Sequence, residues 1–427
     1  MQLPPPLRAL RSRNYRLFVS GQLVSLIGTW MQTVAQSWLI YRFTGSAALL
    51  GLTGFASQFP VFVLAPLGGV VADRLHRQHV LIATQSIMMV LALILAALTL
   101  SGYVQAWHVF LLASLLGVTN AFDIPARQAF LVEMIDHGDI VNAVALNSSM
   151  LNGARIVGPA VAGIVVAAVG EGWCFLLNAI SYVAVIGALL LMHVRPRVGL
   201  HAAVSAWASV VEGFTYSWHT RSVRALLLLL GLVSLMGMPY TVLMPIIADR
   251  ILHGGPHAYG LLLSASGVGA LVGAALLTMR RHIEGLSHWV ALSAIGFGVV
   301  LIAFSFSHAL WLSTLLLVPA GFFMMIEMAS SNTLIQSTVP DRLRGRVMAV
   351  YSMMFMGMAP IGALAAGMLA APLGAPATVA LGGAICIAGG LTFGAALPRQ
   401  PDRLRRLIVT QQAAAGAPPD EATQLQE

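Results

Sequence analysis

The chain of 427 residues is 58% apolar and only 9% charged, with a mean hydropathy of +0.84 and a formal net charge of +8. A soluble globular domain does not carry this composition, so we expect a multi-pass membrane protein with the lipid bilayer as its surroundings. All 23 basic residues are arginine, and they cluster in alternate loops instead of forming one basic surface, which excludes nucleic acid as a partner.

The arginines from Arg8 to Arg16 lead into an apolar run of spanning length, so we predict that this run stays in the protein as a helix and is not a cleaved signal peptide. Apolar runs bounded by charge, glycine or proline then predict twelve transmembrane helices. They cover residues 17–42, 47–71, 80–101, 107–126, 141–168, 173–193, 223–247, 259–279, 286–306, 310–332, 346–371 and 376–397.

The loops between these runs carry very different numbers of arginines. One set of loops, which includes both chain ends, holds 20 arginines, whereas the opposite set holds only Arg42 and Arg250. Positively charged loops stay on the cytoplasmic side. We therefore expect both termini in the cytoplasm.

The longest internal connection divides the spans six and six. The predicted domains are an N-terminal half (1–194), a cytoplasmic linker (195–222), a C-terminal half (223–397) and a disordered cytoplasmic tail (398–427). In the linker, Trp207, Val211, Phe214 and Trp218 recur at helical spacing, which is compatible with an amphipathic interfacial helix or with a plain linker.

The two halves align without a gap when the chain is shifted by 204 residues. Trp107 then falls on Trp311 and Asp123 on Glu327. Further matched pairs are Gly69 with Gly273, Arg77 with Arg281, Gly117 with Gly321, Gly158 with Gly362 and Gly163 with Gly367. Two duplicated six-helix halves form a transporter architecture in which the substrate path runs between them.

The loop after the second predicted span holds Gly69, Asp73, Arg74 and Arg77, and this pattern resembles the signature loop of the major facilitator superfamily. His76 stands where the superfamily usually has glycine. The resemblance implies the major facilitator fold: an all-α membrane protein with twelve transmembrane helices in two pseudo-symmetric halves.

A second motif lies on the fifth predicted span, where Gly158, Pro159 and Gly163, with Gly153 earlier on the helix, resemble the superfamily's antiporter motif. Residues 123–130 and 332–347 are similar to the branch that contains the enterobactin exporter and the macrolide efflux proteins. The resemblance extends to about Pro398 and implies a monomeric, proton-coupled exporter of a small molecule. The helix 4 arginine of many proton-coupled exporters is replaced by Ala113, which puts the usual proton relay of that helix in question.

Arg155 lies fourteen residues into its span, near the middle of the bilayer at about 1.5 Å per residue. Because a charge at this depth is costly, it calls for a reason. One reading is a cationic anchor for an anionic or electron-rich substrate; the other is an arginine held by carbonyls and by amides such as Asn147, Asn152 or Gln58. We favour the anchor and assign Arg155, Gln32, Gln36 and Gln58 to substrate binding.

Gln32 and Gln36 belong to a polar stripe on the first span that also includes Gln22, Ser25 and Thr29. Such a stripe faces either a water-filled path or a neighbouring helix. The residue pattern alone does not separate these two environments.

Asp123 and Glu327 each follow an interfacial tryptophan by sixteen residues, about 24 Å of helix, which places both near the cytoplasmic edge. The resemblance implies that Asp123 pairs with Arg77 or Arg74 and closes the inner end when the substrate path faces outward, and that Asp73 then faces the N-terminus of the eleventh span. We assign the inner gate to Gly69, Asp73, Arg74, Arg77, Asp123 and Arg127. As an alternative, Asp123 and Glu327 are candidates for proton coupling.

These features predict a secondary active transporter that exports an amphipathic small molecule, either a siderophore or a hydrophobic drug, by alternating access. No phosphate-binding loop, metal-ligand spacing or nucleophile and base pair is present, so we expect no cofactor, no metal and no enzyme activity. The alternatives are a major facilitator importer of a small metabolite and a non-transporting membrane receptor.

Overall fold

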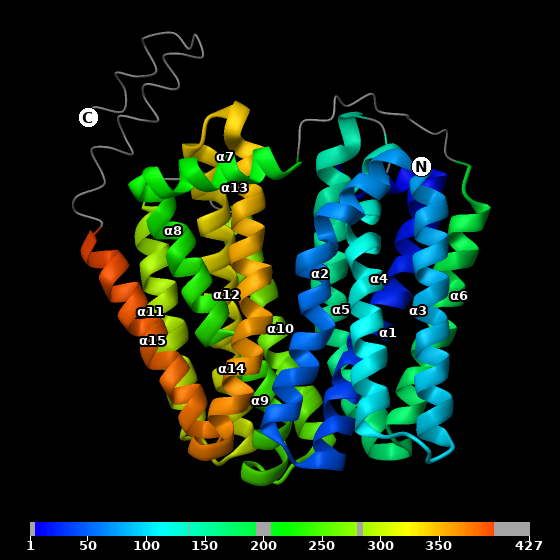
Figure 1. Ribbon diagram of the computed structural model, residues 1–427, viewed down its shortest axis with the longest axis vertical. Coiled ribbons are helices and arrows are strands. Elements are labelled where there is room, and N and C mark those ends of the chain that lie inside the picture. Colours follow the sequence, from blue (N-terminus) through cyan, green and yellow to red (C-terminus); the bar gives the residue numbers. More distant parts are fainter. Residues whose placement is uncertain (1–4, 136, 194–205, 280–284, 397–427) are drawn as a thin grey trace.

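The computed structural model of the protein describes residues 5–135, 137–193, 206–279 and 285–396, and all regular elements in these ranges are helical (Figure 1). The first part of the chain forms η1 (Pro5–Arg11), α1 (Arg13–Thr44), α2 (Ala47–Arg74), α3 (Arg77–Leu100), α4 (Ala106–Glu133), η2 (His137–Asp139), α5 (Ile140–Val169) and α6 (Glu171–Leu191). The second part forms α7 (Ala206–His219), α8 (Arg221–Leu232), η3 (Val233–Gly237), α9 (Tyr240–Ile246), η4 (Ile247–Ile251), α10 (Gly255–Met279), α11 (Leu286–Ser305), α12 (Leu310–Thr338), α13 (Asp341–Ser352), η5 (Met353–Gly357), α14 (Met358–Leu373) and α15 (Ala375–Ala396).

Eleven helices in the described ranges are long and apolar enough to cross a membrane. Two of them are composite, because α8 continues through η3 and α9 to η4, and α13 continues through η5 to α14. Although α1 is 32 residues long, it is more polar than the eleven, since Gln22, Gln32 and Gln36 interrupt its apolar sequence. A helix satisfies its own backbone hydrogen bonds, which is what a lipid environment requires.

The elements η3, η4 and η5 are π-helical turns inside the two composite helices. At η3 the Met238 amide donates to the Val233 carbonyl, one residue further back than in an α-helix. Pro239 follows directly and has no amide hydrogen to continue the ladder. These turns are local breaks in the helical register at which the composite helices can bend.

The long helices pack into two groups. In the first group, α1 packs on α5 and α6, α2 packs on α4, and α3 packs on α4 and α6. In the second group, α10 packs on α12, and α11 packs on α12 and α15. The main contacts between the groups are α5 with α10 and α2 with α14.

Both contacts between the groups are close approaches of glycine-bearing backbones. A Cβ atom at Gly260 would lie 2.3 Å from the carbonyl oxygen of Pro159 and 2.8 Å from the Cα atom of Gly163. A Cβ atom at Gly51 would lie 2.4 Å from the Ala363 carbonyl oxygen. Any side chain at Gly260 or Gly51 would push the two groups apart.

The N-terminal helix η1 and the last residues of α15 lie at the same end of the bundle, which we call the terminal end (Figure 1). The other end, where α1 ends and α2 begins, is the far end. Figure 1 shows the two groups meeting toward the far end and diverging toward the terminal end. At the terminal end α7 lies across the second group, so the segment from residue 206 is a helix rather than a plain linker. The predicted disordered tail lies outside the described residues.

Candidate functional site

Arg155 lies in the middle of α5, where side chains from both groups of helices meet. Its guanidinium carbon is 5.8 Å from the centroid of the Trp30 ring on α1. Trp30 therefore lies beside this one charge.

The backbone next to Arg155 is held tightly against α10. The Ser264 hydroxyl donates to the Ile156 carbonyl over 2.8 Å. A Cβ atom at Gly267 would lie 3.3 Å from the Arg155 carbonyl oxygen. The Arg155 side chain thus leaves the backbone at a fixed point on the boundary between the two groups.

Arg155 is half-buried, and no carboxylate of the described residues lies within 4.0 Å of its guanidinium. Asn152, one of the amides considered as its partner, donates instead to the Ser148 carbonyl over 2.9 Å. A guanidinium offers five N–H donors, and charge inside a membrane protein is normally compensated. The arrangement is suited to an anionic or electron-rich ligand beside an aromatic ring.

Gln58 is exposed on α2, on the side of that helix that faces the second group. Gly54, four residues earlier, would bring a Cβ atom 3.5 Å from the Ala363 side chain, and Phe62, four residues later, lies against Gly357. Residues at this spacing share one helical face. Gln58 is therefore positioned between the two groups.

Gln32 and Gln36 have buried side chains on α1. The Gln32 side-chain oxygen accepts a hydrogen bond of 2.6 Å from the Asn178 amide on α6. Gln22 and Ser25 are buried on the same helix. For Gln32 the structure thus shows the interhelical environment, and its oxygen is already engaged.

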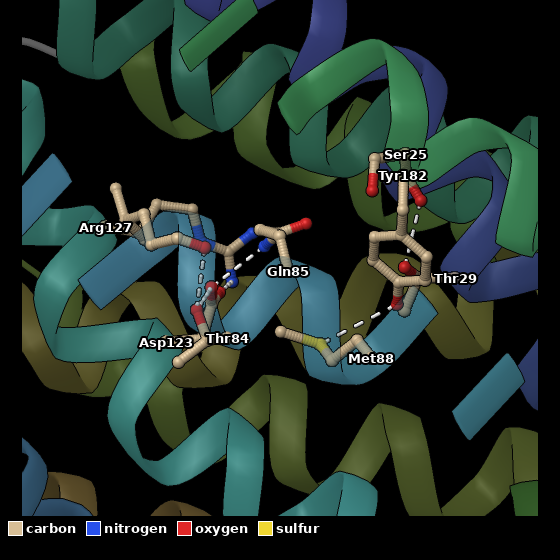
Figure 2. Close-up of polar contacts among 9 residues, drawn as sticks. Ser25, Thr29, Thr84, Gln85, Met88, Asp123, Arg127 and Tyr182 are labelled. Atoms are coloured by element: carbon tan, nitrogen blue, oxygen red, sulfur yellow. Dashed lines mark hydrogen bonds and ion pairs between the residues drawn. The ribbon is translucent and has the colours of Figure 1, made fainter. Parts of the chain in front are cut away.

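Asp123 is fully buried on α4 with three polar side chains around it (Figure 2). Its Oδ1 atom accepts hydrogen bonds of 2.8 Å from the Thr84 hydroxyl and 2.8 Å from the Gln85 amide. Its Oδ2 atom lies 3.3 Å from Arg127 Nη2, one helical turn further along. The carboxylate is thus held inside the first group, where it ties α4 to α3.

The pairing of Asp123 with Arg77 or Arg74, expected when the substrate path faces outward, is not formed in this conformation, and it stays a prediction for the outward-facing one. Arg77 lies 2.7 Å from Glu133 and 3.4 Å from Asp73, and it also donates to the Ala72 carbonyl. The reason is that α4 does not end at residue 126 but continues through Pro125 to Glu133. The acid that reaches the signature loop is therefore Glu133, which the sequence analysis did not single out.

The helices that carry Asp123 and Glu327 extend further toward the terminal end than the predicted spans. α4 continues ten residues beyond Asp123 to Glu133, and α12 continues eleven residues beyond Glu327 to Thr338. At about 1.5 Å per residue, both carboxylates lie roughly 15 Å from the terminal ends of their helices. Both carboxylates are surrounded by the helix bundle, and their depth in the membrane stays a prediction.

Glu327 is buried on α12 and has different surroundings from Asp123. The Ser331 hydroxyl, one turn later, donates to it over 3.3 Å. Among the described residues no arginine or histidine forms an ion pair with it. Burying a charged carboxylate without a cation is expensive, so the neutral, protonated form is favoured by this geometry.

The signature residues at the terminal end of α2 are largely exposed. The Asp73 side chain is 70% exposed, and its partner is Arg77 on α3. A Cβ atom at Gly69 would meet nothing within 4 Å, whereas one at the neighbouring Gly68 would lie 2.0 Å from the Ala121 carbonyl oxygen. Gly68 is thus the glycine that allows α2 and α4 to touch. The expected contact of Asp73 with the N-terminus of the eleventh span is not formed in this conformation.

The motif on α5 lies along the surfaces that meet α1 and α10. A Cβ atom at Gly158 would lie 2.5 Å from the Trp30 Cβ atom, and Pro159 and Gly163 face Gly260. Gly153 has open space instead, with nothing within 4 Å. Three residues of the motif therefore set how closely α5 approaches its neighbours.

At the far end, polar contacts join the two groups of helices. These contacts were not predicted from the sequence. The Tyr41 hydroxyl on α1 donates to Asp249 on η4 over 2.6 Å, and Arg250 donates to the Gly45 carbonyl over 3.3 Å. The only sequence signal was the placement of Arg250 in a loop on that side. Together with the glycine contacts, these bonds hold the far end closed.

Comparison with known proteins gives the family. Residues 5–405 match the model of the transmembrane secretion effector family. The staphyloferrin A transporter of Staphylococcus aureus is 25% identical over 87% of this chain and 94% of its own length. The multidrug efflux pump Tap of Mycolicibacterium fortuitum is 28% identical over 85% of this chain and 90% of its own length. Macrolide efflux protein A of Streptococcus pyogenes is 24% identical over 86% and 93%.

Among solved structures, the nucleoside transporter NupG superposes with a TM-score of 0.71 over 90% of this chain and 98% of its own, at 14% sequence identity. This level of identity shows a shared fold. The all-α membrane fold expected from the sequence is thus confirmed in its broad form. The resemblance to the efflux branch is confirmed too, and the matched family and relatives are membrane transporters, not enzymes. The chain belongs to the transmembrane secretion effector family. This is a family of major facilitator transporters, which move small molecules across membranes.

Proposed function

We propose that this protein exports an anionic or electron-rich amphipathic small molecule, a siderophore or a hydrophobic drug, across the bacterial inner membrane by proton-coupled alternating access. The observation that carries the proposal is Arg155, which lies half-buried between the two groups of helices beside Trp30, without a carboxylate partner among the described residues. The relatives include a siderophore transporter and two drug efflux proteins.

The proposal includes the finer architecture. We count α1 with the eleven apolar helices, which makes twelve spans in two six-helix halves, residues 1–194 and 223–397, joined by 195–222. The scheme puts the terminal end in the cytoplasm, because the loops there are rich in arginine. The protein acts as a monomer in this scheme, because the substrate path lies between its own two halves.

Alternation then takes place between two closures. In the present conformation the far end is closed by Tyr41 with Asp249 and by the glycine contacts, while Asp73 is exposed at the terminal end. In the opposite conformation Asp73, Arg74 and Arg77 close the terminal end. The π-helical turns of the two composite helices supply the places where the backbone bends.

Of the two candidates for proton coupling, the geometry favours Glu327. Asp123 is paired with Arg127 and accepts two hydrogen bonds from α3, so its contacts tie α4 to α3. Glu327 has a hydroxyl group as its partner and can lose its proton when the conformation changes.

Transport into inverted membrane vesicles tests the proposal, with a carboxylate siderophore, a macrolide and the cation ethidium as probes. Arg155→Ala should lower uptake of the best anionic or electron-rich probe at least about tenfold, because a charged hydrogen bond is lost, while Arg155→Lys retains part of it. Arg16→Ala, an exposed arginine at the terminal end, is the control. Unchanged uptake by a folded Arg155→Ala protein would show that Arg155 does not anchor the substrate.

The same vesicles separate the alternatives. An importer loads right-side-out vesicles and not inverted ones. A non-transporting receptor binds a probe without moving it in either orientation, and its response does not depend on Asp73.

A further inference from the structure

The helix α7 presents apolar side chains to the outside of the protein. Val211, Phe214 and Trp218 lie on one face at helical spacing, and each is about half exposed. The rings of Phe214 and Trp218 are stacked, with centroids 6.1 Å apart. The opposite side of α7 packs on α13, where Gly213 lies against the Arg346 backbone. One face of α7 is thus anchored in the protein, and the other is apolar and uncovered.

Phe214 and Trp218 of this uncovered face form one wall of a groove between α7, α8 and the composite helix α13 to η5. The apolar lining of the groove consists of Phe214, Trp218, Leu227, Leu228, Val350 and Met354. Ser217 also lines it, but its hydroxyl donates to the Gly213 carbonyl within α7. The groove therefore offers an apolar surface with its own hydroxyl group already satisfied.

Arg224 stands at the rim of this groove. Its guanidinium carbon is 5.5 Å from the centroid of the Trp218 ring, and it donates one hydrogen bond of 3.2 Å to the Trp218 carbonyl. The nearest acid on α7, Glu212, is engaged by Arg346. Among the described residues no carboxylate pairs with Arg224, so its remaining donors are available to an anion.

The groove opens toward the bilayer. Leu228 lines it and is 53% exposed, on a helix that is long and apolar enough to span the membrane. Arg224 precedes Leu228 by one turn and lies three residues from the start of α8, a depth of about 5 Å. Trp218 beside it is of the residue type enriched where hydrocarbon meets headgroups. An arginine and a tryptophan at this level face phosphate groups, and the leucine below them faces acyl chains.

We propose that the groove between α7, α8 and η5 is a binding site for an anionic phospholipid, with the phosphate on Arg224 and one acyl chain along Leu228 and Met354. The site is separate from the substrate path at Arg155 and does not depend on which molecule is exported. Charge selects the occupant: a single unpaired cation above an apolar groove favours a lipid with net negative charge over a zwitterionic one.

Native mass spectrometry of the full chain tests this, after reconstitution with phosphatidylglycerol or with phosphatidylcholine of the same acyl chains. The wild type should retain one phosphatidylglycerol molecule with an affinity at least about fivefold higher than for phosphatidylcholine, the effect expected of one arginine near a membrane surface. Arg224→Gln should lose this preference, and Arg16→Gln, at an exposed arginine away from the groove, should keep it.

A second variant tests the proposal in case Arg224→Gln fails to fold. Leu228→Glu puts a carboxylate one turn from Arg224 and neutralises it without removing it, at a side chain that is already exposed. This variant should also lose the preference for phosphatidylglycerol. Equal retention of the two lipids by the wild type, or an unchanged preference in both folded variants, would overturn the proposal.

Discussion

Substituting Gly260 by alanine should shift the protein away from the conformation described here. In this conformation a Cβ atom at Gly260 would lie 2.3 Å from the Pro159 carbonyl oxygen, whereas ordinary contacts begin at 3.4 Å. Both atoms belong to or adjoin helix backbone, so neither can rotate away. α5 and α10 would have to separate by about 1 Å at the contact that closes the far end.

The size of the shift follows from the cost of that clash. Extra methyl groups in well-packed interiors typically cost about 1–3 kcal/mol. Alanine also favours the helix over glycine by roughly 1 kcal/mol, but it does so in both conformations, and this term cancels. The ratio of far-end-open to far-end-closed molecules should therefore rise by about 5- to 150-fold.

Distances between spin labels measure this ratio. One label replaces Phe43 at the end of α1, and the other replaces Trp311 at the start of α12; both side chains are exposed. The two native cysteines, Cys174 and Cys386, are buried and are changed to alanine in all variants. Gly260→Ala should increase the population with a longer distance across the far end.

Gly153→Ala on α5 is the matched control, since a Cβ atom there meets nothing within 4 Å. Gly51→Ala, which would clash with the Ala363 carbonyl at the other contact between the groups, should act like Gly260→Ala. The reasoning fails if Gly260→Ala leaves the distance distribution unchanged, or if Gly153→Ala changes it equally.

Two further predictions concern charged residues. Asp73→Asn should reduce transport in vesicles far more than Leu277→Asn at the repeat-related position. Because Asp73 is exposed here, its substitution should leave the thermal stability of the protein unchanged; equal transport by the two variants would rule out the asymmetric gate. Glu327→Gln keeps the size of the side chain. It should abolish accumulation of the transported probe driven by a pH gradient but leave downhill flux of the same probe intact. Full accumulation driven by the gradient would exclude Glu327 from the coupling step.

Much of the helical architecture could be predicted from the sequence. Long apolar runs must form helices in a bilayer, because no other local structure satisfies the backbone, and the eleven apolar helices correspond to predicted spans. The signature loop and the residues of α5 identified the superfamily before the fold was known. Arg155 was also recognisable, since an isolated charge in an apolar run is unusual in any fold.

The partners of the charged side chains were decided by the tertiary structure. Apolar periodicity does not show how far a helix continues beyond the hydrocarbon core, so the extension of α4 to Glu133 was missed, and with it the pairing of Arg77. The hydrogen bond between Tyr41 and Asp249 connects residues 208 positions apart, which no local sequence pattern relates. Whether a polar side chain contacts a neighbouring helix, as Gln32 does, or lies exposed between the two groups, as Gln58 does, depends on how the helices are rotated, and packing alone determines that rotation.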